Sequence, residues 1–416
     1  RSRERLLRTQ RRPKPSVLCK FTRHQILALL TLLLAEFISF CSMSVMAPFF
    51  PREAGLKGMS PSVSGFVFSF YAFVVFATSP FFGKILPFMG AKFLFMSGMF
   101  LAGGCNILFG VLPLIRDYTV FAVFCFLIRT LEAVGASAYA TASFVFVVEI
   151  FPDNISGVLG LLETAMGLGM SAGPAIGGFL YSIGGFGLPF YLLGALMIII
   201  IPTNWNTLPA ISGSGKGTQH ASFAKLFKIP AVSIIGAIII VASNTWSFLD
   251  PTLEPHLSLQ HVSSYQIGLI FLLFASLYGI FSPIWGWLAD KIGNHWSMMV
   301  IGLFLSSAGL LILGPSPLIG METSLWMDIS GLCIIGISVA MTLMPTFQAI
   351  LKCAEEKGLK KDLTTYSIVA GAWSCMYSLG DMTGPALGGI LSEYFGFHIC
   401  TTVMAGLSFF TVSFKF

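Results

Sequence analysis

The strongest constraint on the fold of this chain is a six-residue phrase that occurs twice. It reads Gly173-Pro174-Ala175-Ile176-Gly177-Gly178 in the first copy and Gly384-Pro385-Ala386-Leu387-Gly388-Gly389 in the second, 211 residues later. Another phrase, Ser79-Pro80-x-x-Gly83, returns as Ser282-Pro283-x-x-Gly286 after 203 residues. Because two unrelated phrases repeat in the same order, we interpret the chain as two similar halves.

The low content of charged residues indicates whether the two halves lie in water or in a lipid bilayer. Only 10% of the 416 residues are charged, 55% are apolar, and the mean hydropathy is +0.84. A soluble domain carries about 25% charged residues, so this chain cannot cover a water-exposed surface. A membrane helix needs about 20 mostly apolar residues. That length predicts twelve spans, at 25–47, 64–86, 92–113, 118–150, 156–182, 187–202, 230–250, 265–288, 296–315, 324–350, 364–391 and 396–416.

The predicted fold is therefore an all-α membrane protein with twelve transmembrane helices in two six-helix halves. We assign residues 1–24 to a basic cytosolic tail, 25–202 to the N-terminal half, 203–229 to a polar cytosolic linker and 230–416 to the C-terminal half. Lys and Arg mark the cytosolic face of membrane proteins. With the N-terminus in the cytosol, twenty Lys and Arg residues lie on that side and three on the other, which predicts this orientation.

Five ionisable residues lie deep within the predicted spans, where a charge is costly and usually faces a cavity or a partner. They are Glu36, Arg129, Glu132, Glu163 and Asp381. Four acids against one base predict an acidic interior, which suits a cationic substrate or protons. A carboxyl group in a low-dielectric interior also holds a proton readily, so a proton relay is chemically available.

Some of these residues also have a structural interpretation. Arg129 and Glu132 are three residues apart on one helix face and can neutralise each other. Glu163 can simply make a hydrogen bond within the bundle, and a structural role stays open for Asp381. We expect a proton-coupling role for Glu36, Arg129, Glu132 and Glu163, and a substrate-binding role for Glu36, Glu132 and Asp381. Three further acids at span edges are expected to be solvated ends: Asp250, Glu254 and Asp328.

Aromatic side chains could line a cavity beside these acids, because ring faces attract cations. The candidates are Tyr71, Trp246, Tyr278, Trp373 and Tyr377, although most aromatic residues in such a chain pack or face lipid. The eight cysteines are scattered singly without a C-x-x-C pair, and we predict no metal site. The segment Gly213–Thr218 lacks the spacing of a phosphate-binding loop, so it does not imply ATP. We expect no cofactor, and no nucleic acid as a partner.

An enzyme is also disfavoured, because no histidine lies deep in a span. A receptor or scaffold that does not transport stays open as an alternative from another class.

At this point the residues resemble a known family. Two six-span halves, the repeated Gly-Pro phrase and the loop Gly286-Trp287-Leu288-Ala289-Asp290-Lys291-Ile292-Gly293 resemble the major facilitator superfamily. The segment Arg129-Thr130-Leu131-Glu132-Ala133-Val134-Gly135 resembles its Arg-x-x-Gln-Gly-x-Gly motif, with Glu132 in place of Gln. The end of the first span, Val45–Pro51, resembles that of the vesicular amine transporters, and the polyamine branch looks closest.

The chain departs from the monoamine transporters in the placement of its acids. The positions where those proteins carry acids in spans one and eleven are Ser39 and Ser374 here, with Glu36 and Asp381 displaced along each helix, and Lys352 stands where their acid in span ten would be. These shifts put monoamine recognition in doubt.

The resemblance implies a proton-coupled antiporter that loads organic cations, with polyamines favoured, from the cytosol into acidic secretory or synaptic vesicles. A monomer is expected, with small organic cations, protons and the lipid bilayer as its partners. Vesicular monoamine transport and cation or drug export at the plasma membrane remain alternatives.

Overall fold

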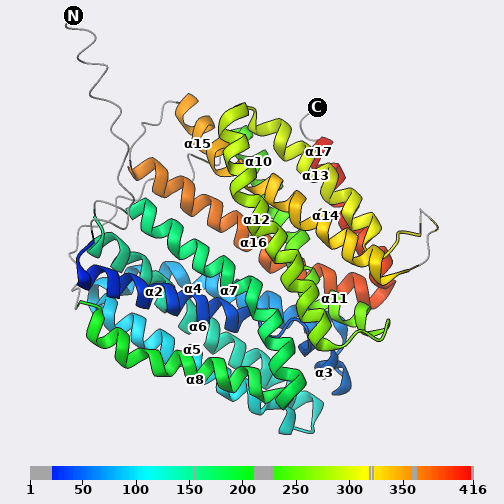
Figure 1. Ribbon diagram of the computed structural model, residues 1–416, viewed down its shortest axis with the longest axis horizontal. Coiled ribbons are helices and arrows are strands. Elements are labelled where there is room, and N and C mark those ends of the chain that lie inside the picture. The colour runs from blue at the N-terminus through cyan, green and yellow to red at the C-terminus, as the bar shows by residue number, and fades with distance from the viewer. Residues whose placement is uncertain are drawn as a thin grey trace, which may run out of the picture.

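The computed structural model describes residues 21–152, 155–209, 226, 228–317, 320, 323–357 and 363–413. Figure 1 shows the chain as two bundles of helices lying side by side, blue to green for the first and lime to red for the second. The first bundle consists of α2 (Arg23–Ser44), α3 (Phe50–Leu56), α4 (Pro61–Met89), α5 (Ala91–Val111), α6 (Tyr118–Ile150), α7 (Ile155–Gly184) and α8 (Gly187–Thr207), with a 3-10 turn η2 (Leu112–Leu114).

The second bundle repeats this order. It consists of α10 (Pro230–Ser247), α11 (Leu249–Ser258), α12 (Ser264–Ile292), α13 (His295–Ile312), α14 (Leu325–Leu343), α15 (Thr346–Glu356), α16 (Leu363–Phe395) and α17 (Phe397–Ser413). Within the described residues, nine helical segments are long and apolar enough to cross a bilayer, and α17 is a shorter apolar helix. With the 30 residues of α7 and the 33 of α16, these helices occupy the twelve predicted spans.

The structure extends the prediction at three places. The short helix α3 follows the first span, and α11 and α15 continue the seventh and tenth spans beyond their predicted ends. Helix α8 runs on to Thr207, past the predicted end at 202, with Pro202 inside the helix. The linker limits at 203 and 229 stay a prediction, because most of that segment and most of the basic tail lie outside the described residues.

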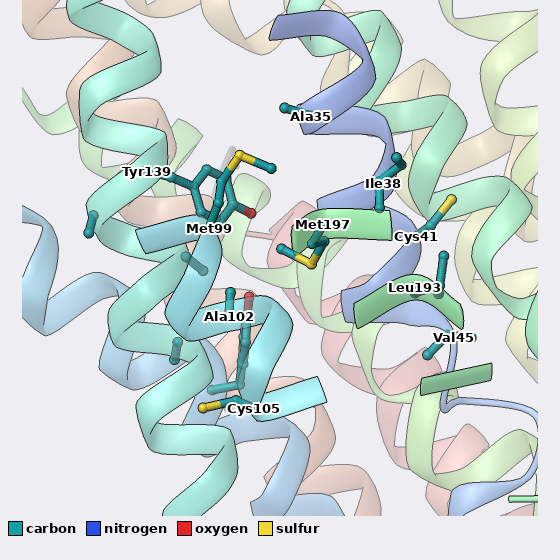
Figure 2. Packing of buried hydrophobic residues seen from close by; sticks show 14 of the residues in the cluster. Ala35, Ile38, Cys41, Val45, Met99, Ala102, Cys105, Tyr139, Leu193 and Met197 are labelled. Carbon is teal, nitrogen blue, oxygen red and sulfur yellow. The ribbon is translucent and has the colours of Figure 1, made fainter. Parts of the chain in front are cut away.

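Each half has its own apolar core. One core cluster runs from Ala28 to Leu208, and the other from Leu226 to Val412 with Ala47 added from the first half. Figure 2 shows part of the first core, where Ile38 and Cys41 of α2 lie beside Met197 of α8, and Met99 of α5 lies beside Tyr139 of α6. The two large cores are thus distinct, one in each half, and a third, small cluster of Ala289, Met298 and Met341 lies in the second half.

The two Gly-Pro segments, on α7 and α16, lie where helices of different halves touch. Here, the far side is the end of the bundle that holds α3 and α11, and the near side is the opposite end. On the far side α7 crosses α12, and a Cβ on Gly268 would lie 2.5 Å from the carbonyl oxygen of Pro174. At the pseudo-equivalent crossing of α16 and α4, Gly65 lies against the carbonyl oxygen of Pro385.

The same crossings are repeated one turn away. A Cβ on Gly178 would lie 2.5 Å from the carbonyl oxygen of Ser264, and one on Gly389 would lie 2.6 Å from that of Pro61. Real side chains do not approach so closely, so glycine is required where these helix backbones touch. We call these backbone contacts, together with the packing of α11 against α3 and α4, the far-side seal. Both α4 and α12 begin at a serine N-cap near this seal, Ser60 and Ser263, whose hydroxyl groups accept from the amide three residues on.

Candidate functional site

A small cavity of about 30 Å³ lies between the two halves, just inside the far-side seal. Residues of α2, α4, α6 and α7 line it from the first half, and residues of α10, α11, α12 and α16 from the second. Such a volume has room for about two waters but none for an organic cation. The two prolines of the repeated phrase, Pro174 and Pro385, form part of its wall.

The first half contributes a buried ion pair. Arg129 and Glu132 on α6 are 2% and 3% exposed, and 2.7 Å separates Nη1 from Oε2. The other oxygen, Oε1, accepts from the side-chain amide of Asn106 at 3.1 Å. The guanidinium of Arg129 also lies 4.4 Å from the ring centroid of Tyr71, and both of these side chains line the cavity. Glu132 is therefore fully engaged, and Arg129 is the member of the pair that faces the cavity.

The second half contributes two carboxyl groups, Asp250 of α11 and Asp381 of α16. No described residue forms a hydrogen bond or an ion pair with either of them. The expectation that Asp250 is a solvated end is wrong: the helix does not stop at the predicted edge but continues through α11 to Ser258. A sequence signal existed, because Trp246 and Asp250 are four residues apart and so share one helix face. Trp246 also lines the cavity.

Glu36 lies in a different place, inside the first half. It is 0% exposed on α2, and neither carboxyl oxygen has a hydrogen-bond partner among the described residues. The hydroxyl group of Ser143 on α6 is near it but lies outside hydrogen-bonding geometry. An unpartnered carboxylate this deeply buried is costly in its charged form, so the group is suited to holding a proton. It does not line the cavity.

The remaining candidates lie around the cavity. Trp246 packs against Tyr278 of α12 with ring centroids 5.1 Å apart. Trp373 and Tyr377 of α16 stack at 5.3 Å, and the indole of Trp373 donates to the hydroxyl group of Thr346 at 2.9 Å. The structure thus brings Tyr71, Arg129, Trp246 and Asp381 to one cavity and leaves Tyr278, Trp373 and Tyr377 outside its wall. Glu163 on α7 is exposed.

The other two span-edge acids are buried, so the expectation that they are solvated is wrong for them as well. Asp328 is 0% exposed and accepts hydrogen bonds from Gln260 at 2.6 Å and from the amide of Gly314 at 3.0 Å. Its Oδ2 also lies 3.0 Å from Nε2 of His256. Glu254 is 1% exposed and has no hydrogen-bond partner among the described residues. Tertiary packing covers the far-side ends of these helices, which span length alone cannot predict.

The described side chains contain no group of three or more His, Cys, Asp or Glu residues that could hold a metal ion. The cavity instead combines Arg129, which pairs with Glu132, with two acids that the described residues leave unpaired, Asp250 and Asp381, in a largely apolar wall. Its charged groups can interact with ions and water, while the cavity of about 30 Å³ is too small for an organic molecule.

Comparison with known proteins now places the chain. The model of the Major Facilitator Superfamily matches residues 32–240 and 235–416. The MFS-type transporter SLC18B1 of Homo sapiens is 39% identical over 380 residues, covering 91% of this chain and 82% of that protein. Its counterpart in Rattus norvegicus is 38% identical over 382 residues, covering 91% and 83%. The Synaptic vesicular amine transporter of Homo sapiens is 22% identical, covering 82% of this chain and 63% of that protein.

Solved structures agree on the fold. A bacterial homologue of the human lysosomal transporter Spinster, in an inward-facing and occupied conformation, superposes with a TM-score of 0.79 at 14% identity, covering 95% of this chain and 96% of that one. The nucleoside transporter NupG superposes with a TM-score of 0.69 at 14% identity, covering 94% and 99%. Relatives and fold are those of transporters and not of enzymes. The chain belongs to the major facilitator superfamily and, within it, to the group of the MFS-type transporters SLC18B1.

Proposed function

We propose that this transporter is a proton-coupled antiporter of organic cations and that polyamines such as spermidine and spermine are its preferred substrates. The observation that carries the proposal is the pair of carboxyl groups, Asp250 and Asp381, which line one cavity without a hydrogen-bonding or ionic partner among the described residues. A carboxylate in an apolar wall is costly unless it is paired. An ammonium group of a substrate would supply that pairing.

The number of acids favours a polyvalent cation. A polyamine carries several ammonium groups separated by methylene spacers, so it needs several acids with apolar surface between them. A pair of unit charges at 4 Å is worth roughly 4 kcal/mol at an effective dielectric constant of about 20. Glu132 was expected to be one of these acids, but Arg129 and Asn106 already occupy its oxygens. We therefore propose Asp250 as the second acid beside Asp381, with the ring faces of Tyr71 and Trp246 between them.

Proton coupling needs a group that gains and loses a proton and that the substrate does not itself contact. Glu36 fits this role because it is fully buried, has no partner and lies apart from the cavity. We propose that Glu36 carries the proton, and that the pair of Arg129 and Glu132 links it to the cavity through α6. Glu163 is exposed, so its proposed part in coupling is smaller.

The transport cycle we propose is the rocking of one half against the other around this cavity. Two features support it: the halves have separate cores, and they meet on the far side through backbone contacts at Gly65 and Gly268 that can part without breaking either core. Since the cavity of about 30 Å³ cannot hold a polyamine, a substrate would enter only as the halves move apart. The near side is proposed to face the cytosol and the far side the lumen of a secretory or synaptic vesicle.

The test is uptake by purified protein in liposomes with an acidic interior. Labelled spermidine should accumulate, and unlabelled spermine should compete better than serotonin or dopamine. Collapse of the proton gradient with a protonophore should abolish accumulation, and liposomes without protein provide the baseline. Uptake that continues after the gradient is gone would contradict proton coupling, and equal competition by monoamines would contradict the polyamine preference. Export at the plasma membrane is the alternative, and imaging of the full-length protein in cells separates the two locations.

A further inference from the structure

Glu254 occupies an unusual position in the far-side seal. It lies on α11 of the second half, and α11 packs against α3 and α4 of the first half, as Figure 1 shows for α3. Glu254 is 1% exposed, and both carboxyl oxygens lack a hydrogen-bond partner among the described residues. A buried acid without a partner thus sits where the two halves touch.

The first half places a cation, Arg52, and an acid, Glu53, near this carboxyl group, but neither forms an ion pair or a hydrogen bond with it. The backbone amide of Arg52 on α3 faces Glu254 but lies outside hydrogen-bonding geometry, and the side chain of Arg52 is exposed and forms no ion pair with it. Glu53, the next residue, adds a second acid nearby, whose Oε1 accepts from the hydroxyl group of Tyr181 on α7. Glu53 therefore has a partner and Glu254 has none.

Other titratable groups near the seal are already engaged elsewhere. His256 is two residues further along α11 and pairs with Asp328. Glu393, at the end of α16, is exposed and accepts from the amide of Ser62 at 2.9 Å. Asp250, one turn earlier on α11, faces the cavity. The first turns of α4 and α12 carry no charged residue. Glu254 is thus the one described acid at the seal that is both buried and unpartnered.

Closure of the far-side seal is disfavoured when Glu254 is charged. A carboxylate that loses its water and gains no partner is strongly disfavoured, whereas burial of the protonated group costs far less. When the halves part on the far side, α11 leaves α3 and the carboxyl group regains water. We propose that Glu254 is a proton-binding group of the far-side seal: its protonation from the far compartment lets the two halves close there, and its ionisation favours their separation. This inference rests on the alternating closure proposed above.

Closure that depends on protonation of Glu254 would have a direct consequence for an antiporter. An acidic far compartment would protonate Glu254 in the open state and drive closure, returning the empty carrier to the near side. The proton acts here on the conformation and not on substrate binding, so its effect exists without substrate.

The test measures the distance between the halves on the far side. Leu56 and Leu259 are exposed there, one on each half, at 74% and 81%. Spin labels attached at these two positions through a non-natural amino acid leave the native cysteines untouched, and pulsed electron resonance then reads their separation in full-length protein without substrate. In the wild type the ratio of close to distant populations should rise about tenfold or more from about pH 8 to about pH 5. In Glu254→Gln, which resembles the protonated group, the close population should dominate and change less than about twofold over that range.

Two control variants test whether another acid near the seal, and not Glu254, causes the pH response. Glu393→Gln removes an exposed acid on the same face and should keep the pH response of the wild type, and Glu53→Gln should keep it as well. A wild type without pH response, a Glu254→Gln variant that responds like the wild type, or a response that disappears only in Glu53→Gln would each overturn the proposal. Because no substrate is present, failure of spermidine uptake would contradict the proposed function and leave these distances as a separate result.

Discussion

Gly268 of α12 lies directly against the carbonyl oxygen of Pro174 of α7, so close that a Cβ on the glycine would come within 2.5 Å of that oxygen. The two residues belong to different halves, and Gly65 of α4 makes the equivalent contact with Pro385 of α16. Close approach of two helix backbones through small residues is a common way for membrane helices to associate. Here it forms the far-side seal, and this explains in physical terms why the chain contains the Gly-Pro phrase twice.

Gly268→Ala should therefore weaken far-side closure. Overpacking of a tight contact costs about 1–3 kcal/mol, which is roughly 5- to 150-fold in a conformational equilibrium. We expect the far-side distance between labels at Leu56 and Leu259 to shift toward the separated population, and uptake to fall. Gly279→Ala, on the same helix but with open space around it, is the matched control and should change neither. Unchanged distances in Gly268→Ala would show that α7 and α12 can accommodate the added methyl group without weakening far-side closure.

Asp250→Asn and Asp381→Asn should each weaken polyamine binding more than the binding of a monovalent amine. Each substitution removes one of two negative charges, and only a polyvalent cation uses both. Competition uptake with spermine and with a monovalent amine of similar length measures the difference. Equal losses for both classes of competitor would contradict a site with two acids, even if the protein transports cations.

Glu36→Gln should abolish net gradient-driven uptake while the protein stays folded. The side chain makes no hydrogen bond that glutamine would break, so thermal unfolding should shift little or move upward. Exchange of labelled for unlabelled substrate without a gradient should persist, because it does not require the proton to leave. Glu163→Gln is the comparison, since this exposed acid should give a milder loss. Full accumulation by Glu36→Gln would remove that residue from the mechanism.

Glu132→Ala should destabilise the protein because it leaves Arg129 buried and unpaired. Removal of one partner of a buried ion pair costs about 3–5 kcal/mol, whereas Glu163→Ala at an exposed site should stay within about 0.5 kcal/mol. Thermal unfolding in detergent compares the two variants. Replacement of both partners, as Arg129→Met with Glu132→Leu, should recover much of the stability but not transport, because Arg129 lines the cavity. Similar unfolding temperatures for the two alanine variants would contradict this role.

The sequence by itself determined the membrane spans and their division into two halves, but not the short helices α3, α11 and α15. These features depend on apolar length and on local composition, which a single stretch of chain carries: α6 begins and ends at the predicted residues, Tyr118 and Ile150. Deep burial of Glu36 and Arg129 was also predictable, since both lie far from any span end.

Only the tertiary structure decided which charges meet. Asp381 shares its cavity with Asp250, Glu132 is engaged by Asn106, and Glu254 is buried at the contact with α3, although Asp250 and Glu254 stand at the edge of a predicted span. These neighbours come from helices that are distant in sequence, and their contacts depend on where those helices cross. Span length and hydropathy contain no information about crossing points. The Gly-Pro phrase did mark the crossings, but its partners Gly65 and Gly268 became visible only when the two halves were packed together.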